Sequence, residues 1–326
     1  GRALDEVQRR RWPTMNVEPL NTSERERLIV ETLASCGKTL EPSMVLRIAA
    51  APQSSNPLYL RVLLEELRLF GDHACLSARI ERYLESHDTI DLFKQVLTRW
   101  ETDYGGSSEL VKEAMCLIWG ARRGLTESEI LDMLGNDDRQ LSRSRWSPLY
   151  LAAESSLVNR GGLLCFAHDY LRQAVRDKYL PSATLQNGIH GRLADYFEAR
   201  PSGLRRFDEL PWQLSQAHAW QRLVEILSDL SFFNAAWETN EFDVKALWAE
   251  IEAKSDFRLV DACSAILEHP GWRAGDTWHV STLLEYTGHL RESLRLREYL
   301  ASRYESAGDM NSLQICLGGQ SRILHI

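Results

Sequence analysis

Apolar residues recur at helical spacing along most of the chain, with short polar breaks between the runs. A clear case spans residues 58–70, where Leu60 and Leu67 fall on one face and Gly71 follows the last apolar position. Alternating apolar and polar positions, typical of a half-buried strand, occupy only a small part of the chain. The pattern therefore predicts a mainly α-helical protein.

Start signals place the first predicted helices. Ser23 with Glu26 three residues later has capping-box spacing and predicts a helix that runs to about residue 34. A second helix follows Pro42, and Pro57 stands where the first turn of a third helix tolerates proline. A further helix is predicted over residues 90–103, before a Tyr-Gly-Gly boundary.

A different arrangement follows that boundary. Residues 109–119 predict an amphipathic helix, Thr126 and Glu129 predict a capping box that opens a helix ending near Gly135, and residues 146–154 predict a third helix. Two apolar runs then flank Gly161-Gly162, which is a two-residue hairpin signal. Three short helices followed by a hairpin predict a winged-helix unit.

Winged helices often bind DNA through a basic third helix, and this expectation can be checked in the sequence. The predicted third helix, residues 146–154, carries no basic residue. The protein has a formal net charge of -8, so its long-range field repels phosphate backbones. We therefore expect no nucleic acid among its partners.

The C-terminal half predicts further helices over residues 190–198, 212–230 and 244–251. Beyond Pro270-Gly271, two amphipathic runs are joined by short turns, and Ala307-Gly308-Asp309 leads into another helix. This pattern resembles a tetratricopeptide helix pair, with Ser293 and Leu313 at positions where the consensus has alanine. Such an array would bind a protein or a peptide on its concave face.

Composition adds three exclusions. Six cysteines stand singly, without the paired spacing of zinc sites or the density of a secreted disulfide protein. No apolar run approaches the roughly 18 residues of a membrane span. The first twenty residues are rich in arginine and lack a signal-peptide core. These features predict a cytoplasmic protein with no membrane partner and no metal.

The two ends of the sequence carry no start or stop signal. Gly1 is followed at once by a helical run, and the run that ends at Ile326 has no C-terminal cap. We expect the sequence to be an internal piece of a longer protein.

Three segments together resemble a known family. They are Asn56-Pro-Leu-Tyr-Leu60 continuing through residue 71, Arg122-Arg-Gly-Leu-Thr-Glu127, and Phe166-Ala-His-Asp-Tyr-Leu-Arg-Gln-Ala-Val175. Over roughly residues 1–240 the chain resembles STAND-class NTPases of the NACHT-like branch, which includes nephrocystin-type and bacterial NACHT proteins with tetratricopeptide repeats. The family consists of an ATPase core, a helical lid, a winged helix and a C-terminal sensor array.

The resemblance implies a division of this chain into five parts: the end of an NTPase core (1–22), a helical lid domain (23–104), a winged-helix domain (105–180), a helical linker or arm (181–275) and the start of a tetratricopeptide-like array (276–326).

The phosphate-binding loop of the family has no counterpart here. Ser35-Cys-Gly-Lys-Thr39 repeats only the last residues of a GxxxxGK[ST] motif and lacks its glycine-rich cradle, so we reject Lys38 as a phosphate-binding lysine. No acidic pair follows a buried strand to hold magnesium. The chain is therefore predicted not to be an enzyme, to hydrolyse no ATP and to bind ATP or ADP tightly only as part of a longer, ATPase-active parent.

The resemblance nevertheless implies which residues would face a nucleotide in that parent. The family's lid proline packs near the adenine and corresponds to Pro57, with Leu58 and Leu60 as further apolar wall; its winged-helix histidine touches the terminal phosphate of ADP and corresponds to His168. The alternative for Pro57 is ordinary helix-start chemistry. For His168 the alternative is a buried histidine satisfied by the backbone.

The function implied is the regulatory part of a nucleotide-dependent signalling switch that oligomerises when a partner or ligand is sensed. Its partners would be proteins and further copies of the parent, and bacterial immunity is one setting that uses this plan. The alternative is a helical, tetratricopeptide-type interaction scaffold with no nucleotide role. A phosphate-binding loop upstream would discriminate the two.

Overall fold

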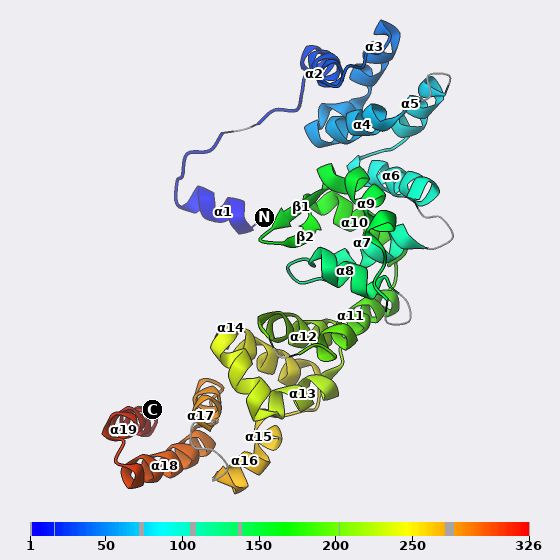
Figure 1. The fold of residues 1–326 in the computed structure, drawn as a ribbon. Coiled ribbons are helices and arrows are strands. Elements are labelled where there is room, and N and C mark those ends of the chain that lie inside the picture. The colour runs from blue at the N-terminus through cyan, green and yellow to red at the C-terminus, as the bar shows by residue number, and fades with distance from the viewer. Residues whose placement is uncertain are drawn as a thin grey trace. The chain divides into compact units, whose positions relative to one another are not determined.

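The computed structural model describes residues 2–15, 17–71, 75–104, 109–135, 139–201, 203–270 and 277–325 (Figure 1). These residues form a succession of helices, and their only sheet is a two-stranded hairpin. The predicted mainly α-helical class is confirmed.

Contacts within the chain separate two units. The first contains residues up to 111 together with 168–178, and the second contains residues 112–167 together with those from 179 onward. The five-part division expected from the sequence is finer, and it stays a prediction.

The first unit is built around helix α4 (Pro57–Leu69), which has one long apolar face. Leu60 and Leu63 of this helix are fully buried, as are Ile29 and Phe93 from its neighbours. Burying each such leucine stabilises the fold by about 1.5–3 kcal/mol, so this face contributes to the stability of the unit. The helices of the unit are α1 (Arg2–Arg9), α2 (Thr22–Ser35), α3 (Pro42–Ala50), α4 (Pro57–Leu69), α5 (Leu76–Leu84), α6 (Thr89–Tyr104) and α10 (Asp169–Tyr179), with a short 3-10 turn at Pro52–Ser55.

The capping box of α2 lies two residues before the predicted one. The side chain of Asn21 accepts from the backbone N–H of Glu24 at 3.0 Å, and the Glu24 carboxylate accepts from the N–H of Asn21 at 2.8 Å. The predicted Ser23–Glu26 box is therefore wrong. Asparagine is as good an N-cap as serine, and both pairs have the same spacing.

The second unit begins with the predicted three helices and hairpin. The elements are α7 (Leu110–Gly120), α8 (Glu127–Met133), α9 (Arg143–Ala153), β1 (Leu157–Arg160) and β2 (Leu163–Phe166). The strands are antiparallel with Arg160 opposite Leu163. Gly161 and Gly162 have φ of 62° and 90°, the positive values that a type I′ turn requires. The predicted hairpin is confirmed, and so is the capping box of Thr126 and Glu129.

The third helix differs from its prediction in a way that affects charge. It begins at Arg143, three residues before the predicted start, and so includes Arg143 and Arg145, both exposed. Pro148 lies inside this helix rather than in its first turn. The statement that this helix carries no basic residue is therefore wrong.

The remaining helices follow one another without further strands among the described residues. The predicted helix 212–230 is two helices, because the chain turns at His218, whose φ is 56°. Asn240, with φ −164° and ψ 98°, breaks the long helix α14 into two parts, between the predicted helices 212–230 and 244–251. The elements are α11 (Ala183–Glu198), α12 (Leu204–Gln216), α13 (Trp220–Ser228), α14 (Leu230–Lys254), α15 (Leu259–Ala262) and α16 (Ser264–Glu268).

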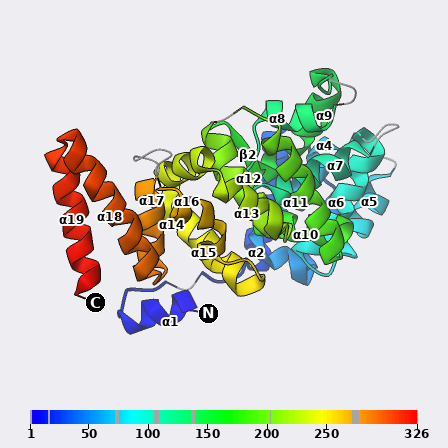
Figure 2. The same ribbon diagram turned by 90° about the horizontal axis from the view of Figure 1, so that it is seen from below.

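Three helices end the described chain: α17 (Thr277–Tyr286), α18 (Leu290–Ala307) and α19 (Met310–Leu324). Each packs on the next, and Figure 2 shows α18 beside α19. Ser293, at a position where the tetratricopeptide consensus has alanine, is fully buried and donates to the carbonyl of Ser281 at 2.7 Å. Small residues at this crossing let the two backbones approach.

Within the part of the chain that the structure describes, none of the helices combines the length and the apolar character needed to cross a bilayer.

Candidate functional site

The four residues predicted to face a nucleotide all lie in the first unit. Pro57 is the first residue of α4 and is exposed, and the side chain of Asn56 caps the helix by accepting from the N–H of Leu58 at 2.9 Å. Leu58 is half-buried, but Leu60 has no exposed surface. A ligand could contact Pro57 and Leu58 directly, whereas Leu60 would support them from the core. Their nucleotide role stays a prediction.

His168 lies in the bend directly before α10 and is exposed. No hydrogen bond or ion pair holds its imidazole among the described residues. The alternative of a buried histidine satisfied by the backbone is therefore wrong, and the side chain is accessible to a ligand. Contact with a phosphate stays a prediction.

Lys38 has a structural role that agrees with its rejection as a phosphate-binding residue. Its ammonium donates to the backbone carbonyls of Leu67 and Phe70, at 3.3 and 2.6 Å. These carbonyls end α4, where the helix leaves acceptors without helical partners and the helix dipole favours a cation. Lys38 therefore caps the C-terminus of α4.

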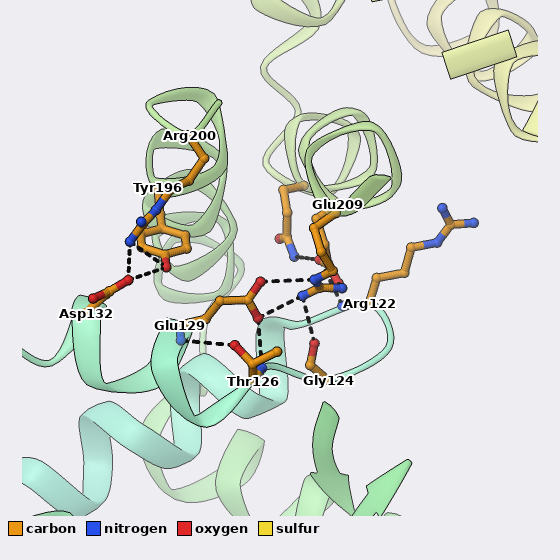
Figure 3. A network of polar contacts seen from close by, with 10 residues as sticks. Arg122, Gly124, Thr126, Glu129, Asp132, Tyr196, Arg200 and Glu209 are labelled. Carbon is orange, nitrogen blue, oxygen red and sulfur yellow. Dashed lines mark hydrogen bonds and ion pairs between the residues drawn. The ribbon is translucent and has the colours of Figure 1, made fainter. Parts of the chain in front are cut away.

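A group of densely bonded polar side chains lies in the second unit. It joins the Arg122–Glu127 turn and α8 to α11 and α12, and Figure 3 shows its side chains converging. We call it the polar joint. Its members are Arg122, Gly124, Thr126, Glu129 and Asp132 on one side, and Tyr196, Arg200, Arg205, Glu209 and Gln213 on the other.

Residues of the Arg122–Glu127 turn form hydrogen bonds with the hairpin, with α8 and with α12. Leu125 pairs with Leu164 of the hairpin through hydrogen bonds of 3.1 and 2.7 Å. Thr126 caps α8, and Gly124, with φ of 108°, leaves its carbonyl free to accept from Arg205 at 3.1 Å. A Cβ at Gly124 would lie 2.5 Å from the carbonyl oxygen of Leu164, so only glycine fits.

Arg205 of α12 is the central cation of the joint. It donates to both carboxylate oxygens of Glu129, at 3.0 and 3.1 Å, and to Glu209 at 3.2 Å. This planar fork is the geometry for which arginine differs from lysine. Glu129 therefore links two helices, because it binds Arg205 of α12 and also completes the capping box of α8.

Glu209 is buried completely, and each of its oxygens has a partner. One accepts from Arg205, and the other accepts from the side chain of Gln213 at 2.9 Å and from the backbone N–H of Arg122 at 3.3 Å. Burial raises the pKa of Glu209, and the bonds from Gln213, Arg205 and Arg122 offset only part of this rise. The fold therefore favours the neutral form of this acid more than water does.

Gln213 extends the network into the core. Its amide also donates to the carbonyl of Gly120 at 2.9 Å, at the end of α7, and its oxygen lies 2.8 Å from Nδ1 of His190. His190 packs between the rings of Trp119 and Trp212, with centroids 5.4 Å away in both cases. The end of α7 is thereby attached to α11 and α12.

Two further contacts widen the joint. Asp132 at the end of α8 accepts from the hydroxyl of Tyr196 at 2.9 Å and pairs with Arg200, as Figure 3 shows. Arg122 donates to the side chains of Asp208 and Asp243, both at 2.9 Å. The joint thus connects α8 with α11, and the turn with α12 and α14, across 64 to 121 residues of sequence.

Sequence reasoning found one side of the joint and missed the other. The Arg122–Glu127 turn was noticed for its resemblance and its capping box. The residues that meet it on α12 stand in a predicted helical region without any local signal for their partners. Only the three-dimensional packing of α12 reveals them.

Residues 37–179 match the nephrocystin 3 helical domain. The chain is also similar to human nephrocystin-3, with 26% identity over 231 residues that cover 68% of the chain. The region that matches the nephrocystin 3 helical domain, residues 37–179, contains the Arg122–Glu127 turn and α8. The residues of the joint on α11 and α12 lie beyond that region.

Other relatives carry repeat or NACHT names. A TPR repeat-containing protein of Dictyostelium discoideum is 28% identical over 244 residues, 74% of the chain, and a human NACHT domain- and WD repeat-containing protein is 29% identical over 220 residues, 60% of the chain. The matches span 15%, 17% and 13% of the Dictyostelium protein, nephrocystin-3 and the NACHT protein. No solved structure matches the chain. These relatives support a NACHT-associated helical interaction region with tetratricopeptide-like helices.

Proposed function

We propose that this chain is the lid, winged-helix and sensor-proximal part of a STAND-class, NACHT-like switch. In a longer parent with an ATPase core, ADP would hold the closed state, and sensing of a partner by the repeat array would open it for self-association. The chain itself would bind nucleotide only weakly and would hydrolyse none.

The polar joint is the observation that carries this proposal. A switch of this kind must transmit movement of its sensor helices to the part that contacts the nucleotide, and transmission needs elements that move together. The joint ties the three helices and hairpin to α11, α12 and α14, the helices that lead toward the repeat-like end.

The exposed imidazole of His168 supports the nucleotide contact. A histidine that donates to a phosphate oxygen makes a charge-assisted bond worth about 1.5–3 kcal/mol. This energy would shift the closed-to-open ratio roughly ten- to a hundredfold. A change from 1:99 to 99:1 needs about 5.5 kcal/mol, so His168 would bias the closed state without holding it alone.

The test is His168→Ala in the full-length parent. We expect less ADP to remain bound after purification and a larger oligomer fraction without a trigger, because one bond to the terminal phosphate is lost. The matched control is His87→Ala, which removes another histidine of the first unit, 92% exposed and paired with Asp91 at 3.4 Å.

The same measurements separate the two functions. Unchanged ADP retention and an unchanged monomer population in His168→Ala, at normal thermal stability, would favour the helical scaffold without nucleotide control. An equal loss of ADP in His87→Ala would trace the effect to surface charge.

A further inference from the structure

Three aromatic rings surround the ammonium of Lys245 in the second unit. The Nζ atom lies 3.5 Å from the ring centroid of Tyr286, 5.1 Å from that of Trp237 and 5.3 Å from that of Phe242. Glu241 accepts a hydrogen bond from the same atom at 2.9 Å. All three rings lie within the roughly 6 Å at which a cation is attracted to an aromatic face.

Local structure explains how residues of two helices meet there. The non-helical backbone of Asn240 interrupts α14, and its side chain restarts the helix by accepting from the N–H of Phe242 at 3.1 Å. Phe242 and Lys245 therefore lie in the first turns of the second part. Tyr286 comes from the last residue of α17, which packs on α14.

One of the three rings is buried, and the other two are exposed to solvent. Trp237 is 8% exposed and stacks on His279, with centroids 5.6 Å apart, so it forms a fixed floor. Phe242 and Tyr286 are 71% and 64% exposed. Two large rings left mostly in water next to a charge are not explained by core packing.

A second lysine of the same helix shows that an ion pair does not require these rings. Lys254 pairs with Glu250 at 2.5 Å, with the same four-residue spacing as Lys245 and Glu241. Its side chain is 53% exposed, against 18% for Lys245. The difference between the two lysines is the aromatic surrounding.

We propose that Trp237, Glu241, Phe242 and Tyr286 form an ammonium site that binds a lysine side chain of a protein partner. Lys245 occupies this site in the free chain. The present occupant identifies the ligand chemistry, since an unmodified ammonium is held by three ring faces and one carboxylate. The site is separate from the residues proposed to face a nucleotide and does not depend on that role.

Binding is an exchange of one ammonium for another. A partner lysine must displace Lys245, so the intramolecular occupant lowers the apparent affinity by the fraction of time that the site is filled. A partner that also contacts the exposed rings would overcome this competition. Removing the internal ammonium should therefore reveal the site.

The experiment uses Lys245→Met in the whole chain, with N-acetyl-lysine methylamide as the probe. Ring signals of labelled phenylalanine and tyrosine, followed by NMR, should shift saturably in the variant, with affinity at least about tenfold above that of the original chain. N-acetyl-norleucine methylamide, the neutral analogue, should not bind. Lys254→Met is the matched control and should behave as the original chain does.

A second variant makes the result decisive. Adding Tyr286→Ala to Lys245→Met should abolish probe binding at unchanged helical content. Equal binding of the neutral probe would overturn the proposal by revealing a general apolar surface. So would a Lys245→Met chain, folded by circular dichroism, that binds lysine no better than the original. If Lys245→Met does not fold, Lys245→Gln serves the same comparison.

Discussion

Two arginines of the second unit, one half-buried and one fully buried, show opposite ways of placing a charge in a helical protein. Arg205 of the polar joint uses each of its terminal nitrogens, with bonds to Glu129, Glu209 and the carbonyl of Gly124. Arg297 of α18 is 1% exposed, and within the described part of the chain it has one ion pair, to Glu285 at 2.5 Å. Its Nε and Nη1 atoms have no partner among the described residues.

The surroundings of Arg297 compensate only in part. Its guanidinium lies over the ring of Trp278, with the central carbon 5.2 Å from the centroid. Gly319 of α19 provides the space, because a Cβ there would lie 1.9 Å from Nη1. Glu285 has a second partner in Arg322, at 2.6 and 2.9 Å, so this carboxylate does not depend on Arg297.

The difference between the two arginines shows in which part of the second unit polar contacts fix the packing of the helices. A buried polar network with all members satisfied stabilises one arrangement, whereas a buried group with unused donors lowers stability. The joint belongs to the first kind and fixes how α8, α11 and α12 pack. The C-terminal helices belong to the second kind, and their packing is correspondingly easier to change.

The largest expected effect contrasts the two arginines directly. Arg205→Met should lower the free energy of unfolding by about 3–5 kcal/mol at pH 8, because Glu209 would remain buried without its cation. Arg297→Met should change it by less than about 1 kcal/mol, since Glu285 keeps Arg322 and two unused donors disappear. Urea unfolding monitored by circular dichroism measures both.

Acid provides the internal check on this contrast. Protonation of Glu209 removes the unpaired charge, so the loss in Arg205→Met should shrink at pH 5. Equal losses in the two variants, or a loss in Arg205→Met that does not depend on pH, would contradict the distinction between a satisfied and a half-satisfied arginine.

The fold was predictable where local signals suffice. Gly161-Gly162 between apolar runs located the hairpin, and Thr126 with Glu129 located the start of α8, because each signal describes bonds among residues close in sequence. Helix α5 was missed, since it is short and the side chain of Cys75 makes no cap for it. The start of α9 was predicted three residues too late, and no hydrogen bond from the side chain of Ser142 marks the true start.

The site was less predictable from the sequence, because its bonds join residues that lie far apart along the chain. Arg205 and Glu209 look like a solvated pair four residues apart on a helix face, yet Glu209 is fully buried. The partners of Arg205, Gly124 and Glu129, lie about 80 residues earlier, and no local pattern encodes that distance. The exposure of His168 likewise depends on tertiary structure.

An effect of intermediate size tests the surroundings of Arg297. Gly319→Ala should destabilise the chain by about 1–3 kcal/mol, because the new methyl group overlaps the buried guanidinium. In an Arg297→Met background the same substitution should cost far less. The coupling energy from this double-mutant cycle, measured by urea unfolding, isolates the overlap. Additive losses would mean that α19 yields without involving Arg297.

The smallest expected effect concerns the charge of Glu209 alone. Burial raises its pKa in the folded chain above the ordinary glutamate value of 4.5. A group whose pKa is raised by folding contributes stability below its unfolded pKa and loses it as the pH rises through the folded value. Glutamine does not titrate, so Glu209→Gln should gain stability relative to the original chain between pH 4 and pH 8. The gain is about 1.4 kcal/mol for each unit of the rise in pKa. The difference between the two unfolding free energies, followed against pH, cancels every other titrating group. A difference that changes in the opposite direction would mean that Arg205 outweighs burial and that the joint favours the carboxylate.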